Sequence, residues 1–352
     1  MAETKSIAEF TCPPPLPAKD RIVLGHGSGG KLSAELVRDI FLPAFHNSVL
    51  SRLDDQAVVN VNGTRLAFTT DSFVVKPLFF PGGDIGSLAV HGTVNDLAMG
   101  GATPLFLSAA FIIEEGFSIT ALRCIVDSMQ RAARAAGVQI VTGDTKVAEK
   151  GSGDQLFVNT TGIGEIPQGL ELSANRARPG DKVLLSGSIG EHGIAILGQR
   201  EGLEFASTIE SDSAPLHKLV ADMLVGSREI RCMRDPTRGG LSSALNEISE
   251  QSRVGIQVDE RKILIHDEVK GACEMLGLDP LYVANEGKLV AIVAPEAADA
   301  VLAAMRNNPL GGDAQIIGEV TDDSRRVVTM RTVLGTTRIV DMLSGDQLPR
   351  IC

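Results

Sequence analysis

Residues 54–71 read DDQAVVNVNGTRLAFTTD and contain two β-branched, apolar runs on either side of Asn62-Gly63. An Asn-Gly pair between two such runs is the strongest short-range indication of a β-hairpin. A two-residue turn would place Asp54 opposite Asp71, whereas a three-residue loop with a bulge would place Asp55 opposite Asp71. Either register brings two carboxylates together across the open end of the hairpin. Because like charges there are destabilising, we expect a cation between them, and Mg²⁺ prefers carboxylate oxygens and substrate phosphates.

The residues after this hairpin alternate between helical and strand patterns. Asp84 and Ser118 are suitable N-terminal caps for two helices, and glycine follows the end of each helix. The patterns predict, in order, a helix at 84–99, a strand at 105–113, a helix at 118–136 and strands at 138–144 and 156–166. This strand-rich order predicts an α/β (α+β) fold with segregated hairpins, and not a regular βαβ winding.

A polar stretch, PQGLELSANRARPGD at 167–181, carries two prolines and two glycines without a sustained periodicity. It predicts a boundary between an N-terminal domain at 21–166 and a C-terminal domain at 175–341. The second half then shows its own alternation of elements. Its patterns predict strands at 182–187, 255–258, 281–293, 314–320, 325–332 and 336–341, and helices after Glu191, after Gly239-Gly240, at 267–276 and at 295–307.

The composition argues against several classes of protein. The chain has 352 residues, and 33 Lys and Arg against 44 Asp and Glu give a formal net charge of −11. Nucleic-acid binding needs a basic surface, which this balance does not provide. The 5 cysteines, an odd number, do not form a disulfide framework. No window resembles a membrane span or a secretory signal, so we expect a soluble cytoplasmic protein with a flexible arm at 1–20.

A glycine-rich segment, GHGSGGKLS at 25–33, leads into an amphipathic pattern at 31–41. Through Lys31 it matches the start of a phosphate-binding P-loop, but Leu32 stands where that loop requires a Ser or Thr hydroxyl for magnesium. The backbone N–H groups of a glycine loop before a helix still bind anions. We therefore expect a phosphate contact here without a true P-loop, and the alternative is a flexible glycine hinge.

Three further acids lie at the ends of predicted elements beside Gly or Thr, namely Asp96, Asp144 and Asp235. Each alone is typical of a helix cap or a turn. Basic and glycine residues follow two of them closely in the sequence, and these are Lys146, Arg238 and Gly239. Together with the hairpin acids, this set indicates a site for polyphosphate and magnesium.

Glu286 lies in ANEGKL, inside an otherwise apolar run that we expect to be a strand. Two interpretations stay open, a charge on a solvent-facing side of the strand and a partly buried base with a raised pKa. His91 and Asn95 share one helix face. No second His or Cys cluster has metal spacing, so we do not expect zinc.

Taken together and in order, a set of motifs resembles the HypE family of hydrogenase maturation proteins. The motifs are GHGSGGKL, DDQAVV, TTDSFVVKPLFFPGGDIGSLAVHGTVNDLAMGGATP, VTGDTKV, RDPTRGGL, ANEGKL and the terminal PRIC. The resemblance runs from about Gly25 to Cys352. It implies the two-domain fold of a superfamily that includes aminoimidazole ribonucleotide synthetase, thiamine-phosphate kinase and selenophosphate synthetase. Those proteins bind ATP at the interface of a homodimer whose N-terminal domains pair.

The resemblance also implies a reaction. HypE-like proteins act on their own C-terminal cysteine, here Cys352, to which a partner carbamoyltransferase, HypF, attaches a carbamoyl group. ATP then converts the carbamoyl oxygen into a phosphate ester, and its elimination leaves a thiocyanate. The cyano group passes to iron on the HypC–HypD scaffold and becomes a ligand of the nickel–iron hydrogenase centre. The implied protein is an ATP-dependent carbamoyl dehydratase with a mobile tail at 342–352.

Matching positions imply roles for individual residues. Cys352 would carry the substrate, Glu286 would be the base that removes the amide protons, and Lys146 would assist phosphoryl transfer. The residues implied to bind ATP are Asp55, Asp71, Asp96, Asp144, Asp235, Lys31, Arg238 and Gly239, and the acids among them are implied to bind Mg²⁺. The family pattern favours Asp55 over Asp54, and therefore the bulged hairpin.

Two alternatives to this function remain. One is another ATP-dependent member of the superfamily such as selenophosphate synthetase, although that enzyme carries a reactive Cys or selenocysteine in its glycine loop and residues 25–33 contain none. The other is a non-catalytic carrier that holds cyanide or a metal on Cys352 and uses ATP only to shape a docking surface. Slow ATP turnover that depends on Cys352 would argue against the carrier.

Overall fold

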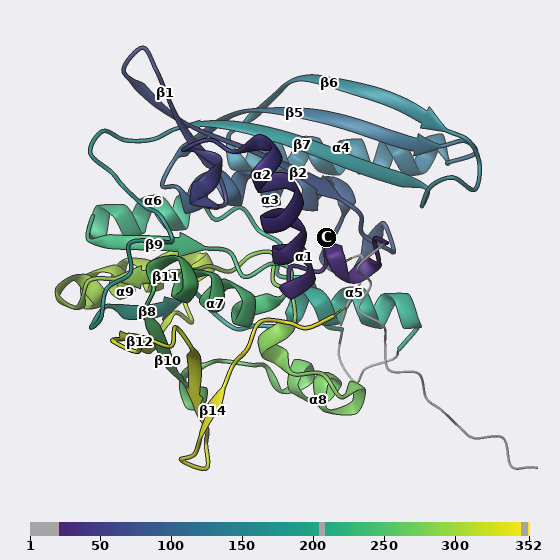
Figure 1. Cartoon of the computed structure of the whole chain (residues 1–352). Helices are drawn as coiled ribbons and strands as arrows, with labels where there is room; N and C mark the ends of the chain where they lie inside the picture. Colours follow the sequence, from purple (N-terminus) through teal and green to yellow (C-terminus); the bar gives the residue numbers. More distant parts are fainter. Residues whose placement is uncertain (1–20, 204–207, 346–350) are drawn as a thin grey trace, which may run out of the picture.

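A computed structural model of the chain describes residues 21–203, 208–345 and 351–352. It consists of two α/β halves, each built on its own sheet (Figure 1), which confirms the predicted fold class. The arm expected at 1–20 lies outside the described residues, as do residues 346–350 of the expected tail. Across the described ranges, no helix reaches the length and apolar character of a membrane span.

The strands form two large sheets and one small ribbon. The first sheet has the order β1-β2-β7-β5-β6 and contains β1 (Ala57–Val61), β2 (Thr64–Phe73), β5 (Thr103–Glu114), β6 (Gln139–Ala148) and β7 (Leu156–Glu165). The second has the order β14-β13-β10-β12-β8-β11-β9 and contains β8 (Lys182–Leu185), β9 (Ile230–Arg234), β10 (Gly255–Asp259), β11 (Val290–Val293), β12 (Gln315–Thr321), β13 (Val328–Arg331) and β14 (Thr337–Ile339). The ribbon pairs β3 (Phe79–Phe80) with β4 (Gly83–Asp84).

The helices connect and cover these sheets. They are α1 (Lys31–Leu36), α2 (Leu42–Phe45), α3 (Ile85–Met99), α4 (Ile119–Ala136), α5 (Glu191–Glu201), α6 (His217–Gly226), α7 (Gly240–Ser252), α8 (Asp267–Leu276) and α9 (Ala298–Asn307). A π-helical segment, Val37–Phe41, joins α1 to α2, so the helix predicted at 31–41 exists and continues beyond its predicted end.

The predicted hairpin forms with a two-residue turn. Val61 pairs with Thr64, and the two turn residues have φ values of 53° and 86°, as expected for a type I′ turn. The bulged hairpin that the family pattern favoured is therefore wrong. Pairing of β1 begins only at Ala57, so the ladder positions neither Asp54 nor Asp55.

The helix α3 lies at the interface between the two halves. Its cap is the predicted one, because the Asp84 carboxylate accepts hydrogen bonds from the N–H groups of Gly86 and Ser87 at 2.7 and 3.1 Å. Its buried residues occur all around its circumference, as expected for a helix enclosed on every side. It packs on β2 and β7 in the first half and on α6 and β9 in the second.

The second sheet is covered on both faces. Alternate residues of β8 face opposite sides: Leu184 shares an apolar cluster with residues of α6 and α9, and Val183 and Leu185 share another with residues of α7. The sequence patterns did not indicate α6 or β9.

The strand predicted at 281–293 is wrong over most of its length, because β11 covers only its last four residues, Val290–Val293. Residues 280–282 form a 3₁₀ turn, and 283–289 have no regular structure. Val283, Ala284 and Asn285 are nevertheless completely buried. Enclosure by neighbouring elements, and not pairing with another strand, explains why this run is apolar.

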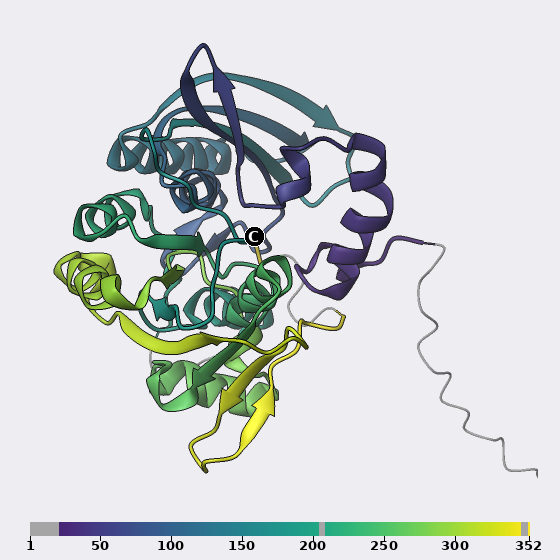
Figure 2. The same cartoon turned by 60° about the vertical axis from the view of Figure 1, so that its left-hand side comes forward.

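The predicted glycine loop lies against the chain that leads to the C-terminus. The Lys31 N–H donates to the Leu343 carbonyl at 2.8 Å, and Ser28 Oγ donates to the Gly345 carbonyl at 2.9 Å. A Cβ at Gly30 would lie 2.2 Å from the Leu343 oxygen, so glycine is needed for this close approach. Figures 1 and 2 both show the C-terminus between the two halves.

Candidate active site

A small cavity lies between the two halves of the chain, and the C-terminal residue is part of its wall. Its lining comes from β2, α3, the turn after β9, the segment before β11 and the C-terminus, and comprises Asp71, Ser72, Phe73, Gly92, Asp96, Asp235, Thr237, Arg238, Glu286 and Cys352. The cavity brings together the greater part of the predicted site, including residues that are far apart in the sequence.

Asp71 and Asp96 form the part of the cavity that belongs to the first half. Asp71 lies on β2, and Asp96 lies on α3 one turn after Gly92. A Cβ at Gly92 would lie 2.9 Å from the Phe73 ring, so glycine permits the helix to approach the strand. Thr69 Oγ1 donates to Asp96 Oδ2 at 2.7 Å. Burial raises the pKa of both Asp71 and Asp96, because a buried environment disfavours the ionised carboxylate.

The second half contributes the turn DPTRGG at 235–240, between β9 and α7. Asp235 and Arg238 line the cavity, and Arg238 Nη1 donates to the Gly27 carbonyl at 3.0 Å. Gly239 has a φ of 79°, and a Cβ there would lie 2.8 Å from the Gly29 oxygen. The predicted glycine loop therefore packs directly on the turn that holds Arg238 and Gly239.

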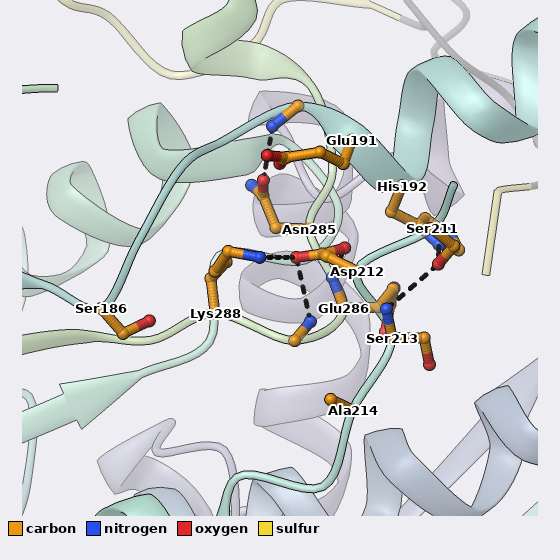
Figure 3. A network of polar contacts seen from close by, with 12 residues as sticks. Ser186, Glu191, His192, Ser211, Asp212, Ser213, Ala214, Asn285, Glu286 and Lys288 are labelled. Carbon is orange, nitrogen blue, oxygen red and sulfur yellow. Dashed lines mark hydrogen bonds and ion pairs between the residues drawn. The ribbon is translucent and has the colours of Figure 1, made fainter. Parts of the chain in front are cut away.

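Glu286 is 2% exposed, and its Oε1 has no hydrogen-bond partner among the described residues. Its backbone, in contrast, is firmly held (Figure 3). The Asp212 carboxylate accepts hydrogen bonds from the N–H groups of Glu286 and Gly287 at 3.0 and 3.2 Å and pairs with Lys288 Nζ at 3.0 Å. Asp212 thus fixes the main chain and leaves the Glu286 carboxyl group available for chemistry in the cavity. Glu286 is therefore buried and does not lie on a solvent-facing side of a strand, and its role as a base stays a prediction.

Asn95 connects α3 to the same segment. Its Nδ2 donates to the Glu286 carbonyl at 3.1 Å, and its Oδ1 accepts from the Leu216 N–H at 2.7 Å. Asn285, beside Glu286, donates to the Pro236 carbonyl at 3.0 Å. These two buried amides fix the acids of α3, the Glu286 segment and the turn after β9 relative to one another.

Cys352 enters the cavity as a neutral thiol. Its terminal carboxylate accepts a hydrogen bond from the Val74 N–H at 3.0 Å. Burial raises the pKa of the Cys352 thiol to about 12, because an apolar environment disfavours the thiolate. At physiological pH the sulfur in this position is therefore protonated.

Burial also opposes ionisation of the cavity carboxyl groups. It raises the pKa of Asp96, Asp235 and Glu286 well above the ordinary values, and the negative neighbours of each group add to the effect. Arg238 acts in the opposite direction on Glu286. The cavity therefore holds more acidic groups than it can keep ionised, and added positive charge would relieve this repulsion.

The acids fit a magnesium ion that arrives with a nucleotide. Within the described part of the chain, no group of three or more His, Cys, Asp or Glu side chains forms a complete metal site. Mg²⁺ usually takes one or two carboxylates together with phosphate oxygens and water. Buried acids that repel one another, beside a glycine loop that leads into a helix, suit that mode of binding.

Asp55 lies beside the cavity and is paired with an arginine. Its Oδ1 accepts from Arg234 Nη1 at 2.8 Å, and burial raises its pKa to about 6, with Asp71 among the neighbouring charges. Asp54 instead accepts from Ser173 Oγ at 2.9 Å. The structure thus places Asp55, and not Asp54, near Asp71, although the hairpin has no bulge.

Three predicted residues lie away from the cavity of their own chain. Lys31 pairs with Asp341 at 2.5 Å. On β6, Lys146 Nζ and Asp144 Oδ2 are 2.7 Å apart, and their side chains are 70% and 62% exposed. Asp144 also lines an open groove between α4 and β6. A single chain does not bring these residues to Glu286 and Cys352.

Several residues that shape the site were not predicted. Asp212 lies in the polar run ESDSA between α5 and α6, which has the composition of any surface loop. Arg234 is the last residue of an undetected strand. Asn95 was noted only for sharing a helix face with His91, which binds Ser213 Oγ at 3.0 Å on the same segment as Asp212. The shared helix face of His91 and Asn95 was the one feature of the sequence that could have indicated a residue of this set.

Two family models match the chain. The model described as AIR synthase related protein, N-terminal domain, matches residues 53–166, and the model described as AIR synthase related protein, C-terminal domain, matches residues 178–331. Together they cover most of both halves.

Named proteins and solved structures are similar to the chain over nearly its whole length. The carbamoyl dehydratase HypE of Rhizobium leguminosarum bv. viciae is 59% identical over 336 residues, which cover 95% of this chain and 96% of that protein. A crystal structure of a HypE–HypF complex matches with a TM-score of 0.84 and 51% identity over 88% of this chain and 99% of the other. A HypE structure in complex with ATP matches with a TM-score of 0.80 and 50% identity over 94% and 100%. The order of the motifs, the fold and these identities show that the chain belongs to the HypE family.

Proposed function

We propose that this protein is an ATP-dependent carbamoyl dehydratase that acts on its own C-terminal cysteine during hydrogenase maturation. The observation that carries the proposal is the common cavity of Cys352, Glu286 and the acids Asp71, Asp96 and Asp235. The name of the R. leguminosarum relative and the ATP-bound HypE structure support it. The product would be a thiocyanate on Cys352 that provides the cyanide ligand of the hydrogenase iron.

The reaction divides into two balanced steps. The carbamoyl oxygen attacks the γ-phosphorus of ATP, ADP leaves, and the amide nitrogen gives up one proton, so that an imidoyl phosphate remains on sulfur. The remaining N–H proton is then removed while the C–O bond breaks, and inorganic phosphate leaves with the former carbamoyl oxygen. Phosphorylation is needed because an amide oxygen alone is a poor leaving group. The sum is loss of one water from the carbamoyl group and hydrolysis of one ATP.

The residues of the cavity suit these steps. Magnesium, when bound, supplies positive charge against the phosphate oxygens. Carboxylates from the group Asp71, Asp96 and Asp235 would hold it together with phosphate oxygens, and Arg238 and the glycine loop would contact phosphate. Glu286 would take the amide protons, since its unpartnered oxygen lines the cavity. Positive charge near the acids would lower their pKa and so favour the ionised, basic form of Glu286.

Loading of the tail and release of cyanide would take place away from the cavity. A nucleophilic attack on a carbamoyl donor needs a thiolate, and burial disfavours the thiolate at the docked position. We therefore infer that the tail leaves the cavity to be loaded by HypF, a partner consistent with the related HypE–HypF complex. Transfer to the HypC–HypD scaffold would follow. Free thiols suit a cytoplasmic location.

A homodimer would complete the site. The face of the first sheet that α3 does not cover exposes apolar side chains, among them Phe68, Phe106 and Ile163, and such a face is suited to pairing with a second copy. The exposed Lys146 and Asp144 on the same sheet would then serve the cavity of the partner subunit. This explains how two residues with implied roles lie away from Glu286 in their own chain.

The direct test is the mass of the C-terminal peptide after incubation with HypF, carbamoyl phosphate and Mg-ATP. In the wild type we expect a carbamoyl adduct on Cys352 that loses one water only when the ATP is hydrolysable. Glu286→Gln should stop at the adduct, with dehydration reduced on the order of a hundredfold or more, the usual contribution of a general base.

Glu274→Gln, a change of an exposed acid on α8, is the matched control and should behave like the wild type. An adduct that forms on Cys352 but never loses water would support the carrier alternative. Normal dehydration by Glu286→Gln would remove Glu286 from its proposed role.

Asp96→Asn tests how far a buried acid lowers the free energy of unfolding. Because burial raises the pKa of Asp96 in the folded state, ionisation of Asp96 opposes folding, and the chain loses stability as the pH rises above the value of an unfolded Asp. The neutral amide can still accept the hydrogen bond from Thr69 Oγ1. In nucleotide-free protein at pH 8 we expect Asp96→Asn to raise the free energy of unfolding on the order of 1 kcal/mol, because one pKa unit corresponds to about 1.4 kcal/mol.

Denaturant unfolding between pH 4 and pH 8 measures this effect, with the exposed Asp127→Asn as control. The gain should shrink towards pH 4, where the carboxyl group is protonated in the folded state and about half protonated in the unfolded state, and ATP-dependent dehydration should be lost at every pH. A destabilised Asp96→Asn at pH 8, or a gain that does not change with pH, would contradict the account.

Mixed dimers test the assignment of Lys146 to the partner's cavity. Lys146→Ala and Glu286→Gln should each be inactive alone. After subunit exchange, ~25% of wild-type activity should return, because half of the dimers are mixed and each mixed dimer has one intact site. A mixture of Asp96→Asn with Glu286→Gln, both in one cavity, should stay inactive. No recovery in the first mixture would show that Lys146 acts within its own chain or not at all.

A further inference from the structure

We propose that a recess beside the start of α5 is a specific binding site for the C-terminal dipeptide Ile351-Cys352, and that His192 is its positioning residue. This inference rests on the proposed function and extends it, because it names the groups that hold the substrate thiol in the cavity. The ligand class is a chain end with an apolar residue followed by cysteine, which the protein supplies itself.

The recess binds the dipeptide at three points. The His192 Nε2 atom is 2.6 Å from the Ile351 carbonyl oxygen, and the Val74 N–H donates to the terminal carboxylate of Cys352 at 3.0 Å. The Ile351 side chain is 4% exposed and joins the apolar cluster that includes Phe80 and Ile194. Hydrogen bonds to the main-chain oxygens of two successive residues, together with the buried Ile351 side chain, define both the position and the direction of the chain end.

The hydrogen-bond network assigns the tautomer of His192. A carbonyl only accepts, so Nε2 carries the proton. Nδ1 is then an acceptor, and Ser211 Oγ, at 2.7 Å, donates to it. Phe80 packs edge-on against the ring at a centroid distance of 5.7 Å, and burial lowers the pKa of His192, which keeps the ring neutral. The ring is thus prepared as a single fixed donor, and without the tail that buried donor would lose its partner.

The same short segment holds the tail site and the proposed base (Figure 3). Ser211 binds His192, and the next residue, Asp212, binds the backbone N–H groups of Glu286 and Gly287. Adjacent residues of one chain segment therefore fix both the group that holds the substrate and the group that reacts with it. We infer that this arrangement fixes the position of the docked thiol relative to Glu286.

The chain offers a matched comparison for His192. His91 is partly buried and also bonds this segment, through Ser213 Oγ at 3.0 Å, but no hydrogen bond joins it to the described residues of the tail. A purely structural role would make the two histidines equivalent. If His192 binds the tail, substitution of His192 should change the accessibility of Cys352, and substitution of His91 should not.

The experiment measures alkylation of Cys352 by iodoacetamide in full-length, nucleotide-free protein, with peptide masses as the readout. The exposed Cys124 and the buried Cys273 are internal references. His192→Leu should increase labelling of Cys352 relative to Cys124 about tenfold, the effect of one lost hydrogen bond of ordinary strength. His192→Gln, which keeps an N–H donor, should stay within about threefold of the wild type, and His91→Leu should not change it.

Equal labelling of Cys352 in His192→Leu and the wild type would overturn the proposal. If Cys273 also becomes labelled, the variant has lost its fold, and Ile351→Ala decides instead, because it alters only the tail: faster labelling of Cys352 supports the recess and unchanged labelling overturns it. Because this test uses neither ATP nor HypF, it stands whether or not the protein proves to be a dehydratase. With HypF, His192→Leu should accept the carbamoyl group at least as fast as the wild type, because its tail leaves the cavity more often, and should lose water at least about tenfold more slowly. Unfolding of the variant would not slow dehydration while leaving carbamoylation intact.

Discussion

The hydrogen bonds of Asn95 are the interaction on which the rest of the site depends. A helix enclosed on all sides, as α3 is, cannot leave a polar side chain unpaired without a large cost. Asn95 meets this requirement with backbone groups of the other half, including the carbonyl of Glu286. The same helix carries Asp96 one residue later. Burial of α3 therefore joins the two halves and, in doing so, places Asp96 of one half and Glu286 of the other in one cavity.

The cavity formed in this way opposes folding of the empty protein. Asp71, Asp96, Asp235 and Glu286 all have raised pKa values, and burial is the largest cause for each. The surrounding framework of Asp212, Asn95 and Asn285 is fully paired and holds the backbone in place. A site of this kind binds positive charge and phosphate strongly because its empty state is unfavourable, which is how stability and function are opposed in many active sites.

The sequence predicted features that depend on local physics. The Asn62-Gly63 turn and the caps Asp84 and Ser118 are local hydrogen-bonding patterns and were found where expected. Features that depend on tertiary packing were not predictable. The run at 281–293 is apolar because it is enclosed, and only four of its residues pair in a strand. Asp212 and His192 have no local signal, since the groups they bind are distant in the sequence. The role of Asp55 was inferred from family resemblance and stays a prediction, and the bulge inferred with it does not exist.

In the proposed mechanism, the carbamoyl oxygen leaves the protein as part of phosphate. This can be measured by loading Cys352 with a carbamoyl group that carries oxygen-18 and determining the isotopic mass of the phosphate released during dehydration. We expect one oxygen-18 atom in phosphate for each thiocyanate formed, and Glu286→Gln should release none. Thiocyanate formation with unlabelled phosphate, and with the label in water, would rule out the phosphate ester, because the oxygen would then have left without being bound to phosphorus.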